Sequence, residues 1–218
     1  IIIDIKRPKS LDNIQYYKCD ITNENQVKKI AKKIVKKNKK VDVLINNAAS
    51  DYVPKGKSND FSLENLNLNI WKKDLNVGLN GSFICTKIFG SLMASRKKGV
   101  ILNISSDLSI IAPNQDLYKS LNFIKPVTYS VVKQGLNGLT KYTAAYWANK
   151  NVRCNAIAPG GIFNHQDKTF LKKIKKVIPL KRLAKKNEYN DLILFLCSDS
   201  SSYMTGSIVI ADGGRTII

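Results

Sequence analysis

Three residues near the middle of the chain have the types and spacing needed for acid/base chemistry. Tyr129 and Lys133 lie four positions apart in the segment YSVVK, and Ser106 ends the segment NISS. Positions i and i+4 share one face of a helix, so the Lys133 ammonium can lie beside the Tyr129 phenol. A neighbouring cation favours phenolate over phenol and lowers the pKa of a tyrosine, as an acid/base catalyst needs. Ser106 could hydrogen-bond the same substrate oxygen.

The Tyr-x-x-x-Lys spacing is not specific by itself. The chain has nine tyrosines, and Tyr146 and Lys150 have the same spacing as Tyr129 and Lys133. This second pair lies at the far end of the same predicted helix and leads into the next strand, so we interpret it as structural. Only the surrounding sequence favours Tyr129.

Apolar runs typical of strands alternate with helical patterns along the chain. Strands are expected at 1–4, 14–20, 41–48, 99–106, 151–159 and 206–212, and helices near 24–38, 67–96, 128–149 and 187–198. Continuously apolar strands separated by helices predict an α/β fold with a doubly wound parallel sheet. The length predicts one domain over residues 1–218.

Ligands of such folds bind at the carboxyl ends of the strands. Two stretches without regular pattern, 49–66 and 107–127, follow expected strand ends. Because irregular segments at that edge commonly carry binding residues, both are candidate rims of a cleft.

The net charge of +20 raises the hypothesis of a nucleic-acid partner. Apolar residues nevertheless recur at helical spacing between Val27 and Lys40, so the lysines there occupy an opposite, solvated face. The segment 171–186 is predicted to be a helix of the same kind. No aromatic residues are interleaved with these lysines as a stacking platform for bases requires. We therefore expect a small-molecule substrate and not a nucleic acid.

Other partners are disfavoured by composition. No apolar run approaches the roughly 18 residues that span a bilayer, so no membrane association is expected. The lone His165 has no second imidazole or carboxylate cluster at ligand spacing, so no metal is expected. The four widely spaced cysteines, each beside apolar residues, are typical of buried thiols in a reducing cytoplasm.

Five segments in this order resemble the classical short-chain dehydrogenase/reductases: KCDIT, LINNAA, NISS, YSVVK and NAIAPGGIFN. The resemblance extends over essentially the whole chain. It implies a Rossmann-like fold and an enzyme that transfers a hydride between the nicotinamide of NAD or NADP and a carbonyl or alcohol. It further implies that Tyr129 is the general acid or base, that Lys133 tunes it and binds the nicotinamide ribose, and that Ser106, rather than Ser105, orients the substrate oxygen.

The resemblance also assigns cofactor contacts along the chain. Asp20 and Ile21 match the pair that meets the adenine ring. The turn that passes the adenosine ribose is matched by Asn47, Ala48 and Ala49, where Ala49 replaces the usual glycine. The segment that contacts the nicotinamide carboxamide is matched by Pro159, Gly160 and Ile162.

Asp4 indicates which dinucleotide the enzyme prefers. It ends the strand-like segment IIID, where a carboxylate can accept hydrogen bonds from both ribose hydroxyls and repel a 2′-phosphate. NAD is therefore expected over NADP, while Lys6 and Arg7 nearby could compensate a phosphate.

In the alignment, IIID matches the second strand of the family fold. We therefore expect the first strand, the glycine-rich turn and the first helix to be missing, which together need about 30 to 40 residues. The first strand normally lies between the second and the fourth, so both neighbours are expected to lack ladder hydrogen bonds on one side.

The chain departs from the family pattern in two places. Gly78 stands where the family often has an active-site asparagine, which puts a proton relay through that position in doubt. A long insert, 107–128, separates Ser106 from Tyr129, and its residues Asn114, Gln115 and Tyr118 are candidates for substrate contact, with a solvated loop as the alternative.

The segments DLSIIAP, LYKS and SSYMTG are similar to dehydrogenases of bacterial surface-sugar and flagellin-glycan synthesis. A sugar or sugar-derived substrate is therefore the first expectation. The alternatives are a 3-oxoacyl-thioester reductase and a non-catalytic binding protein of the same fold. The resemblance also implies a homodimer or homotetramer formed through the long helices.

Overall fold

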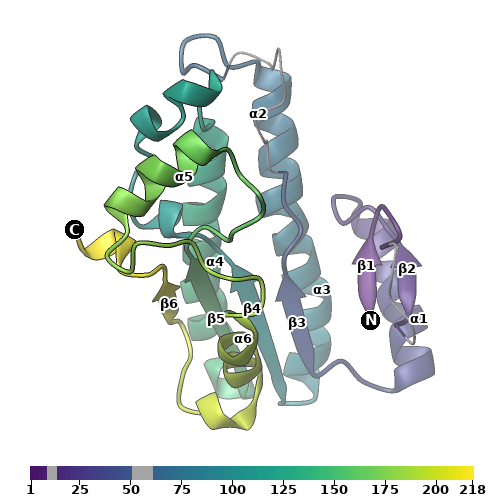
Figure 1. The fold of residues 1–218 in the computed structure, drawn as a ribbon. Helices are drawn as coiled ribbons and strands as arrows, with labels where there is room; N and C mark the ends of the chain where they lie inside the picture. Colours follow the sequence, from purple (N-terminus) through teal and green to yellow (C-terminus); the bar gives the residue numbers. More distant parts are fainter. Residues whose placement is uncertain (9–13, 51–60) are drawn as a thin grey trace.

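The strands of the computed structural model, which describes residues 1–8, 14–50 and 61–218, form two separate parallel sheets (Figure 1). β1 (Ile2–Asp4) pairs with β2 (Tyr16–Lys18). The second sheet has the order β3 (Val43–Asn46), β4 (Gly99–Ile104), β5 (Val152–Pro159) and β6 (Ile208–Ala211). Within the described ranges no ladder joins β1 to β3, so the interruption expected at this point is present.

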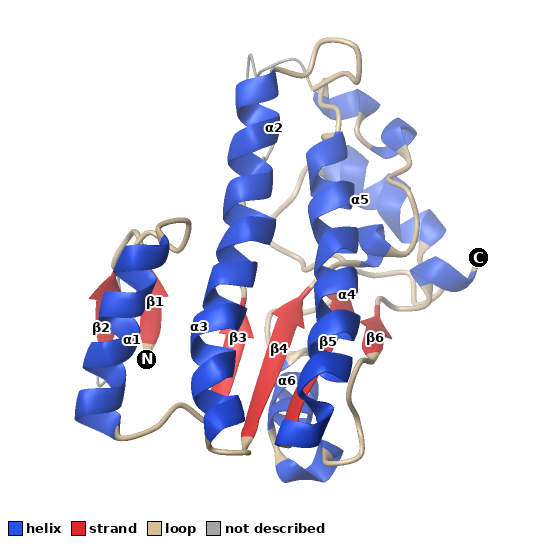
Figure 2. Cartoon of the chain, turned by 180° about the vertical axis from the view of Figure 1, so that it is seen from behind, coloured by secondary structure: helices blue, strands red, loops and turns tan. Residues whose placement is uncertain are grey.

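Helices lie on both faces of the four-stranded sheet and cover its central strands, as the α/β prediction requires. α1 (Glu24–Asn38), α3 (Gly81–Ser95) and α4 (Val127–Trp147) lie on the face that Figure 2 shows in front, and α6 (Asn190–Cys197) lies behind the four-stranded sheet. α1 begins at Asn23, whose side chain accepts a hydrogen bond from the Gln26 N–H. Its buried face packs with Phe89 of α3, while its lysines remain outside.

The two central strands are mostly apolar because each is covered on both sides, and their polar residues Asn103, Arg153 and Asn155 all make hydrogen bonds. Successive side chains of a strand point to opposite faces. Ile101 of β4 packs with Met93 of α3, whereas its neighbour Leu102 packs with Leu196 of α6. All of these side chains are fully buried. The apolar run at 99–102 therefore reflects a strand with no solvent face.

The helical stretch predicted near 67–96 is present and contains a π-helical turn. α2 (Leu68–Leu75) leads into the turn at Asn76–Asn80, and α3 follows directly. Gly78 is buried in this turn, where an added Cβ would lie 2.4 Å from Val132 Cγ1 of α4. The absence of a side chain at Gly78 thus allows the two long helices to approach each other closely.

The helical run Leu68–Ser95 is long and apolar enough to cross a membrane by length and composition alone. Here its buried residues pack against the sheet, and 44% of its most apolar window is inside the protein. This pattern is that of a core helix.

The prediction of a helix over 171–186 was wrong in its second half. α5 (Lys168–Ile174) ends in a short 3-10 turn at Lys175–Val177, and Ile178 is extended. Pro179 explains the break, because proline disfavours helical backbone in the residue before it and cannot donate within a helix. The chain then returns towards the sheet, where Ala184 pairs with Ile162.

Candidate active site

A ladder of buried amide and hydroxyl groups fixes the strands beneath the site. Asn46 at the end of β3 donates from Nδ2 to Asn103 Oδ1 of β4 at 2.8 Å and to Thr86 Oγ1 of α3 at 3.0 Å. Asn103 in turn donates to Thr140 Oγ1 of α4 at 2.8 Å. Buried polar groups that are all paired hold one arrangement of the surrounding backbone. The network therefore sets the position of α4 relative to the strand ends.

Tyr129 and Lys133 meet in the first turns of α4, as their spacing predicts. The Lys133 Nζ lies 5.7 Å from the centroid of the Tyr129 ring and donates a hydrogen bond to the Ile104 carbonyl oxygen, 2.8 Å away, at the end of β4. Only 6% of Lys133 is exposed. Both residues line one small cavity together with Ala49 and Ser50, which follow β3. Tyr146, by contrast, is exposed and stacks on Tyr142.

The two serines of NISS make different contacts. Ser105 Oγ donates to the Lys133 carbonyl oxygen at 3.0 Å and so joins the end of β4 to α4. Ser106 Oγ donates to Asp107 Oδ1 at 2.9 Å and accepts from the Leu108 N–H at 3.2 Å. Ser106 therefore caps the 3-10 turn at Asp107–Ser109, which begins the insert.

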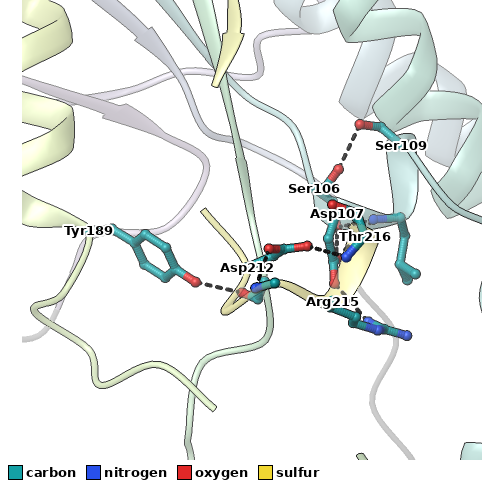
Figure 3. Close-up of polar contacts among 10 residues, drawn as sticks. Ser106, Asp107, Ser109, Tyr189, Asp212, Arg215 and Thr216 are labelled. Atoms are coloured by element: carbon teal, nitrogen blue, oxygen red, sulfur yellow. Dashed lines mark hydrogen bonds and ion pairs between the residues drawn. The ribbon is translucent and has the colours of Figure 1, made fainter. Parts of the chain in front are cut away.

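Asp107 connects this turn to the C-terminal segment (Figure 3). Its Oδ2 accepts a hydrogen bond from Arg215 Nη1 at 2.7 Å, and both side chains are buried. Arg215 is turned inward by the loop before it, where Gly213 and Gly214 have φ values of +70° and +88° that favour glycine. Asp212 closes this loop by accepting from the N–H groups of Gly214 and Thr216.

Apart from Tyr129 and Lys133 on α4, the residues assigned to the cofactor lie at the carboxyl ends of strands or just after them. Asp4 ends β1, where its Oδ1 accepts from the Lys6 N–H at 2.9 Å. After β2, the Asp20 carboxylate accepts from the N–H and hydroxyl of Thr22, and Ile21 covers Gly81 of α3. The remaining residues follow β3 and β5: Asn47, Ala48, Ala49, Pro159, Gly160 and Ile162.

This arrangement fits a dinucleotide at the strand ends. At Gly160 an added Cβ would lie 2.8 Å from the Asp212 Cα. The backbone of Gly160 therefore lies so close to the backbone of Asp212 that no side chain fits between them. The half-buried Asp4 carboxylate at the end of β1 can accept hydrogen bonds from ribose hydroxyls, and the buried Lys133 ammonium is a second polar group of the site. These are donors and acceptors suited to NAD or NADP.

The three candidates for substrate contact have partners within the insert. Asn114 Oδ1 accepts from the Asp116 N–H at 2.9 Å. The side-chain amide of Gln115 donates to the Lys125 carbonyl oxygen and accepts from the Lys125 N–H. The Tyr118 ring lies 5.9 Å from Phe123 and 5.5 Å from Phe170. Their contact with a substrate stays a prediction. Of the other predicted rim, residues 51–60 lie outside the described ranges.

Two charged residues that the sequence analysis did not single out also lie at the site. Asp74 of α2 is 4% exposed, lines the same cavity as Tyr129, and accepts from Thr128 Oγ1 at 2.7 Å. Lys125 places its Nζ 3.8 Å from the centroid of the Tyr129 ring. The order Lys125, Tyr129, Lys133 at intervals of four was the sequence signal for Lys125.

A second tyrosine near the site has a different environment. Burial, and then the negative charge of Asp107, raise the pKa of Tyr189 to about 12. Its hydroxyl donates to the Gly160 carbonyl oxygen at 3.1 Å (Figure 3). Tyr189 is therefore protonated at neutral pH and supports the loop after β5.

Comparisons with known proteins agree with this arrangement. A family described as enoyl-(acyl carrier protein) reductase matches residues 6–216. A 3-oxoacyl-[acyl-carrier-protein] reductase of Thermotoga maritima is 34% identical over 92% of this chain and 76% of its own length. An NAD-dependent glycerol dehydrogenase of Listeria innocua is 32% identical over 91% of this chain and 73% of its own. The post-translational flagellin modification protein A of Campylobacter coli is 31% identical over 65% of this chain and 56% of its own.

Solved structures match over nearly the whole chain. A short-chain dehydrogenase of Leptospira borgpetersenii with bound NAD+ has a TM-score of 0.84 and 30% identity, and the match covers 98% of this chain and 81% of that one. The aldohexose dehydrogenase of Thermoplasma acidophilum has a TM-score of 0.82 and 26% identity, covering 99% and 83%. With the family match, the parallel sheets and the residues gathered at the strand ends, the chain belongs to the short-chain dehydrogenase/reductase family and is an NAD(P)-dependent oxidoreductase.

Proposed function

We propose that the chain interconverts an alcohol and a carbonyl with NAD, and that Tyr129 is its acid/base catalyst. The observation that carries the proposal is the position of Tyr129 and Lys133 on one cavity at the strand ends. The Lys133 ammonium, held by the Ile104 carbonyl oxygen, favours the phenolate form of Tyr129. It is also placed to bind a ribose hydroxyl of the cofactor.

In the oxidative direction, the Tyr129 phenolate takes the proton of the substrate hydroxyl. A nicotinamide bound beside Tyr129 would supply the acceptor for the hydride of the alcohol carbon. The alcohol becomes a carbonyl, and the proton remains on Tyr129 Oη until solvent removes it. In the reductive direction Tyr129 donates that proton to the carbonyl oxygen.

Ser106 is proposed to orient the substrate oxygen. It lies at the end of β4, and its hydroxyl proton is directed to Asp107 Oδ1. To donate to a substrate carbonyl, the hydroxyl must rotate away from Asp107. While it points to Asp107, Ser106 Oγ can only accept, which suits an alcohol substrate.

NAD is proposed as the preferred cofactor because of Asp4. A carboxylate at the end of β1 can accept hydrogen bonds from ribose hydroxyls and repels a 2′-phosphate. The bound NAD+ in the Leptospira structure supports this preference. Lys6 and Arg7, both exposed, are the groups that would favour NADP instead.

A sugar or sugar-derived substrate is proposed from the polar insert and from two similar proteins. One is the aldohexose dehydrogenase of Thermoplasma acidophilum, and the other is the flagellin modification protein of Campylobacter coli. A 3-oxoacyl thioester is the second candidate, because the Thermotoga reductase is 34% identical.

The experiment measures nicotinamide absorbance with purified chain and two substrate panels. One panel holds aldoses, uronic acids and polyols with NAD+ or NADP+, and the other holds 3-oxoacyl thioesters with NADH or NADPH. Tyr129→Phe should abolish turnover while NADH still binds, as followed by nicotinamide fluorescence. Tyr146→Phe is the matched control and should retain activity. Turnover only of thioesters would replace the sugar proposal, and full activity of Tyr129→Phe would refute the acid/base role.

Two further proposals concern the state of the protein in the cell. We propose a homodimer or homotetramer formed through α3 and α4, whose outer faces expose the aromatic side chains of Phe83, Tyr142 and Tyr146. Size-exclusion chromatography with light scattering tests it, and Tyr142→Lys should favour the monomer. A cytoplasmic location is supported by the four free cysteines.

A further inference from the structure

We propose that Lys125, carried by the insert, is a second positively charged residue that acts on Tyr129 and favours its phenolate form. The inference rests on the proposed acid/base role of Tyr129 and gives the insert a function in that chemistry. Lys125 is a positioning residue in this scheme, because it acts on the substrate only through Tyr129.

The geometry places Lys125 closer to the phenol ring than Lys133. The Lys125 Nζ lies 3.8 Å from the ring centroid, whereas the Lys133 Nζ lies 5.7 Å from it. A cation within about 6 Å of an aromatic centroid is attracted by the electrons of the ring face. That attraction grows when the ring carries the negative charge of a phenolate. Tyr129 is thus placed between one cation from the insert and one from its own helix.

The insert holds Lys125 by its backbone. Gln115 Nε2 donates to the Lys125 carbonyl oxygen at 3.0 Å, and the Lys125 N–H donates to Gln115 Oε1 at 3.0 Å. Pro126 follows with fixed φ and starts α4, which carries Tyr129 one turn later. The Lys125 backbone is therefore held close to Tyr129, within reach of the Lys125 side chain.

The rest of the insert supports this position with aromatic packing. Phe123, two residues before Lys125, is 5% exposed and lies 5.7 Å from Phe61 and 5.9 Å from Tyr118, measured between ring centroids. Asn114 caps the 3-10 turn that carries Gln115. The insert between Ser106 and Tyr129 is thus an ordered segment that supports Lys125.

Three charged groups among the described residues face Tyr129 from the elements packed around it. Lys133 comes from α4, Lys125 from the insert, and Asp74 from α2. The negative charge of Asp74 disfavours the phenolate form of Tyr129, although Asp74 Oδ2 accepts a hydrogen bond from the Thr128 hydroxyl at 2.7 Å. Lys125 and Lys133 each favour the charged form of Tyr129, and Asp74 is the group among the described residues that works against them.

The test follows the ionisation of Tyr129 itself and does not need a substrate. Tyrosine labelled with carbon-13 at Cζ gives one NMR signal per tyrosine, and the signal missing in Tyr129→Phe identifies Tyr129. We expect the Tyr129 titration to move up by about 0.5 to 1 pH unit in Lys125→Met. Lys125→Arg should restore most of the wild-type position, because a guanidinium also stacks on aromatic faces.

Lys141→Met is the matched control. It removes the same charge from the exposed side of α4, about three turns beyond Tyr129, and should leave the titration in place. Gln115→Ala keeps Lys125 but removes its two backbone contacts, so it should give a smaller upward shift. Circular dichroism checks the folding of each variant, and Lys125→Gln repeats the test if Lys125→Met unfolds.

The outcomes separate this inference from the proposed function. A Tyr129 titration that is unchanged in both Lys125→Met and Lys125→Gln would overturn the inference, even if Tyr129→Phe abolishes turnover. Turnover that survives in Tyr129→Phe would overturn the proposed acid/base role, whatever the titration shows. Where turnover is measurable, the acid limb of its pH profile in Lys125→Met should move up by the same amount as the NMR titration.

Discussion

The Asp107 carboxylate and the Arg215 guanidinium form an ion pair inside the protein, with 2.7 Å between Oδ2 and Nη1. Their side chains are only 4% and 8% exposed. Because Asp107 also accepts the hydroxyl proton of Ser106, the pair connects the C-terminal segment to a proposed catalytic residue. Loss of either partner would leave the other charge buried.

Arg215→Met should therefore lower the free energy of unfolding by about 3 to 5 kcal/mol, the range for breaking a buried pair on one side. Urea unfolding followed by circular dichroism measures this. Arg182→Met is the matched control, because Arg182 pairs with Glu188 at the solvent-screened surface and its loss should destabilise the protein far less. Adding Asp107→Asn to Arg215→Met should recover part of the loss. Equal effects of the two arginine variants would contradict the prediction.

Gly78→Ala should lower the free energy of unfolding by about 1 to 3 kcal/mol through overpacking. The new Cβ would lie 2.4 Å from Val132 Cγ1, a stiff branched side chain that cannot rotate away freely. Val132→Ala in the same chain should relieve the clash. At Gly138 of α4 an added Cβ meets no atom within 4 Å, so Gly138→Ala should stabilise by about 1 kcal/mol from helix propensity alone. A neutral Gly78→Ala variant would show that the π-helical turn and α4 can separate.

Asp4→Ala should change the cofactor preference. Removing the carboxylate at the end of β1 removes its repulsion of a 2′-phosphate and its hydrogen bonds to ribose. We expect the affinity ratio of NADPH to NADH to rise by about tenfold, which corresponds to about 1.4 kcal/mol. Nicotinamide fluorescence titration with both cofactors measures the ratio. An unchanged ratio would assign the selection to Lys6 and Arg7 instead.

The protein should lose stability between about pH 9 and pH 12 because of its buried thiols. Burial raises the pKa of Cys85 and of Cys154 from 9.0 to about 12. Below pH 9 the thiols are neutral in both states, and their contribution is fully present. As the pH rises, the unfolded chain ionises first and is favoured, by about 1.4 kcal/mol per thiol at pH 10. In Cys154→Ala the melting temperature should fall less steeply from pH 8 to pH 11 than in the wild-type protein. Equal slopes for the two proteins would argue against thiol ionisation as the cause.

The alternation of strands and helices could be predicted from sequence because it depends on local periodicity. The apolar positions of α1 and the apolar run that begins β4 predicted both elements, and both are present. Strand ends were less accurate: the expected strand at 14–20 is Tyr16–Lys18, because pairing partners decide where a ladder stops. The helix predicted through Lys186 ends before Pro179. This proline was by itself a local sequence signal for the end of the helix.

By itself, the sequence determined the family, the Tyr129–Lys133 pair and the expected edge of the sheet, since each depends on residue types at fixed intervals along the chain. Only the tertiary structure decided the partners of the charged groups. Asp107 meets Arg215 across a sequence separation of 108, and Asp74 of α2 lies on the Tyr129 cavity. Such contacts are set by how helices and loops pack at the strand ends, and no local spacing encodes that packing. The same packing brings Lys125 onto Tyr129 and so gives the insert its proposed role.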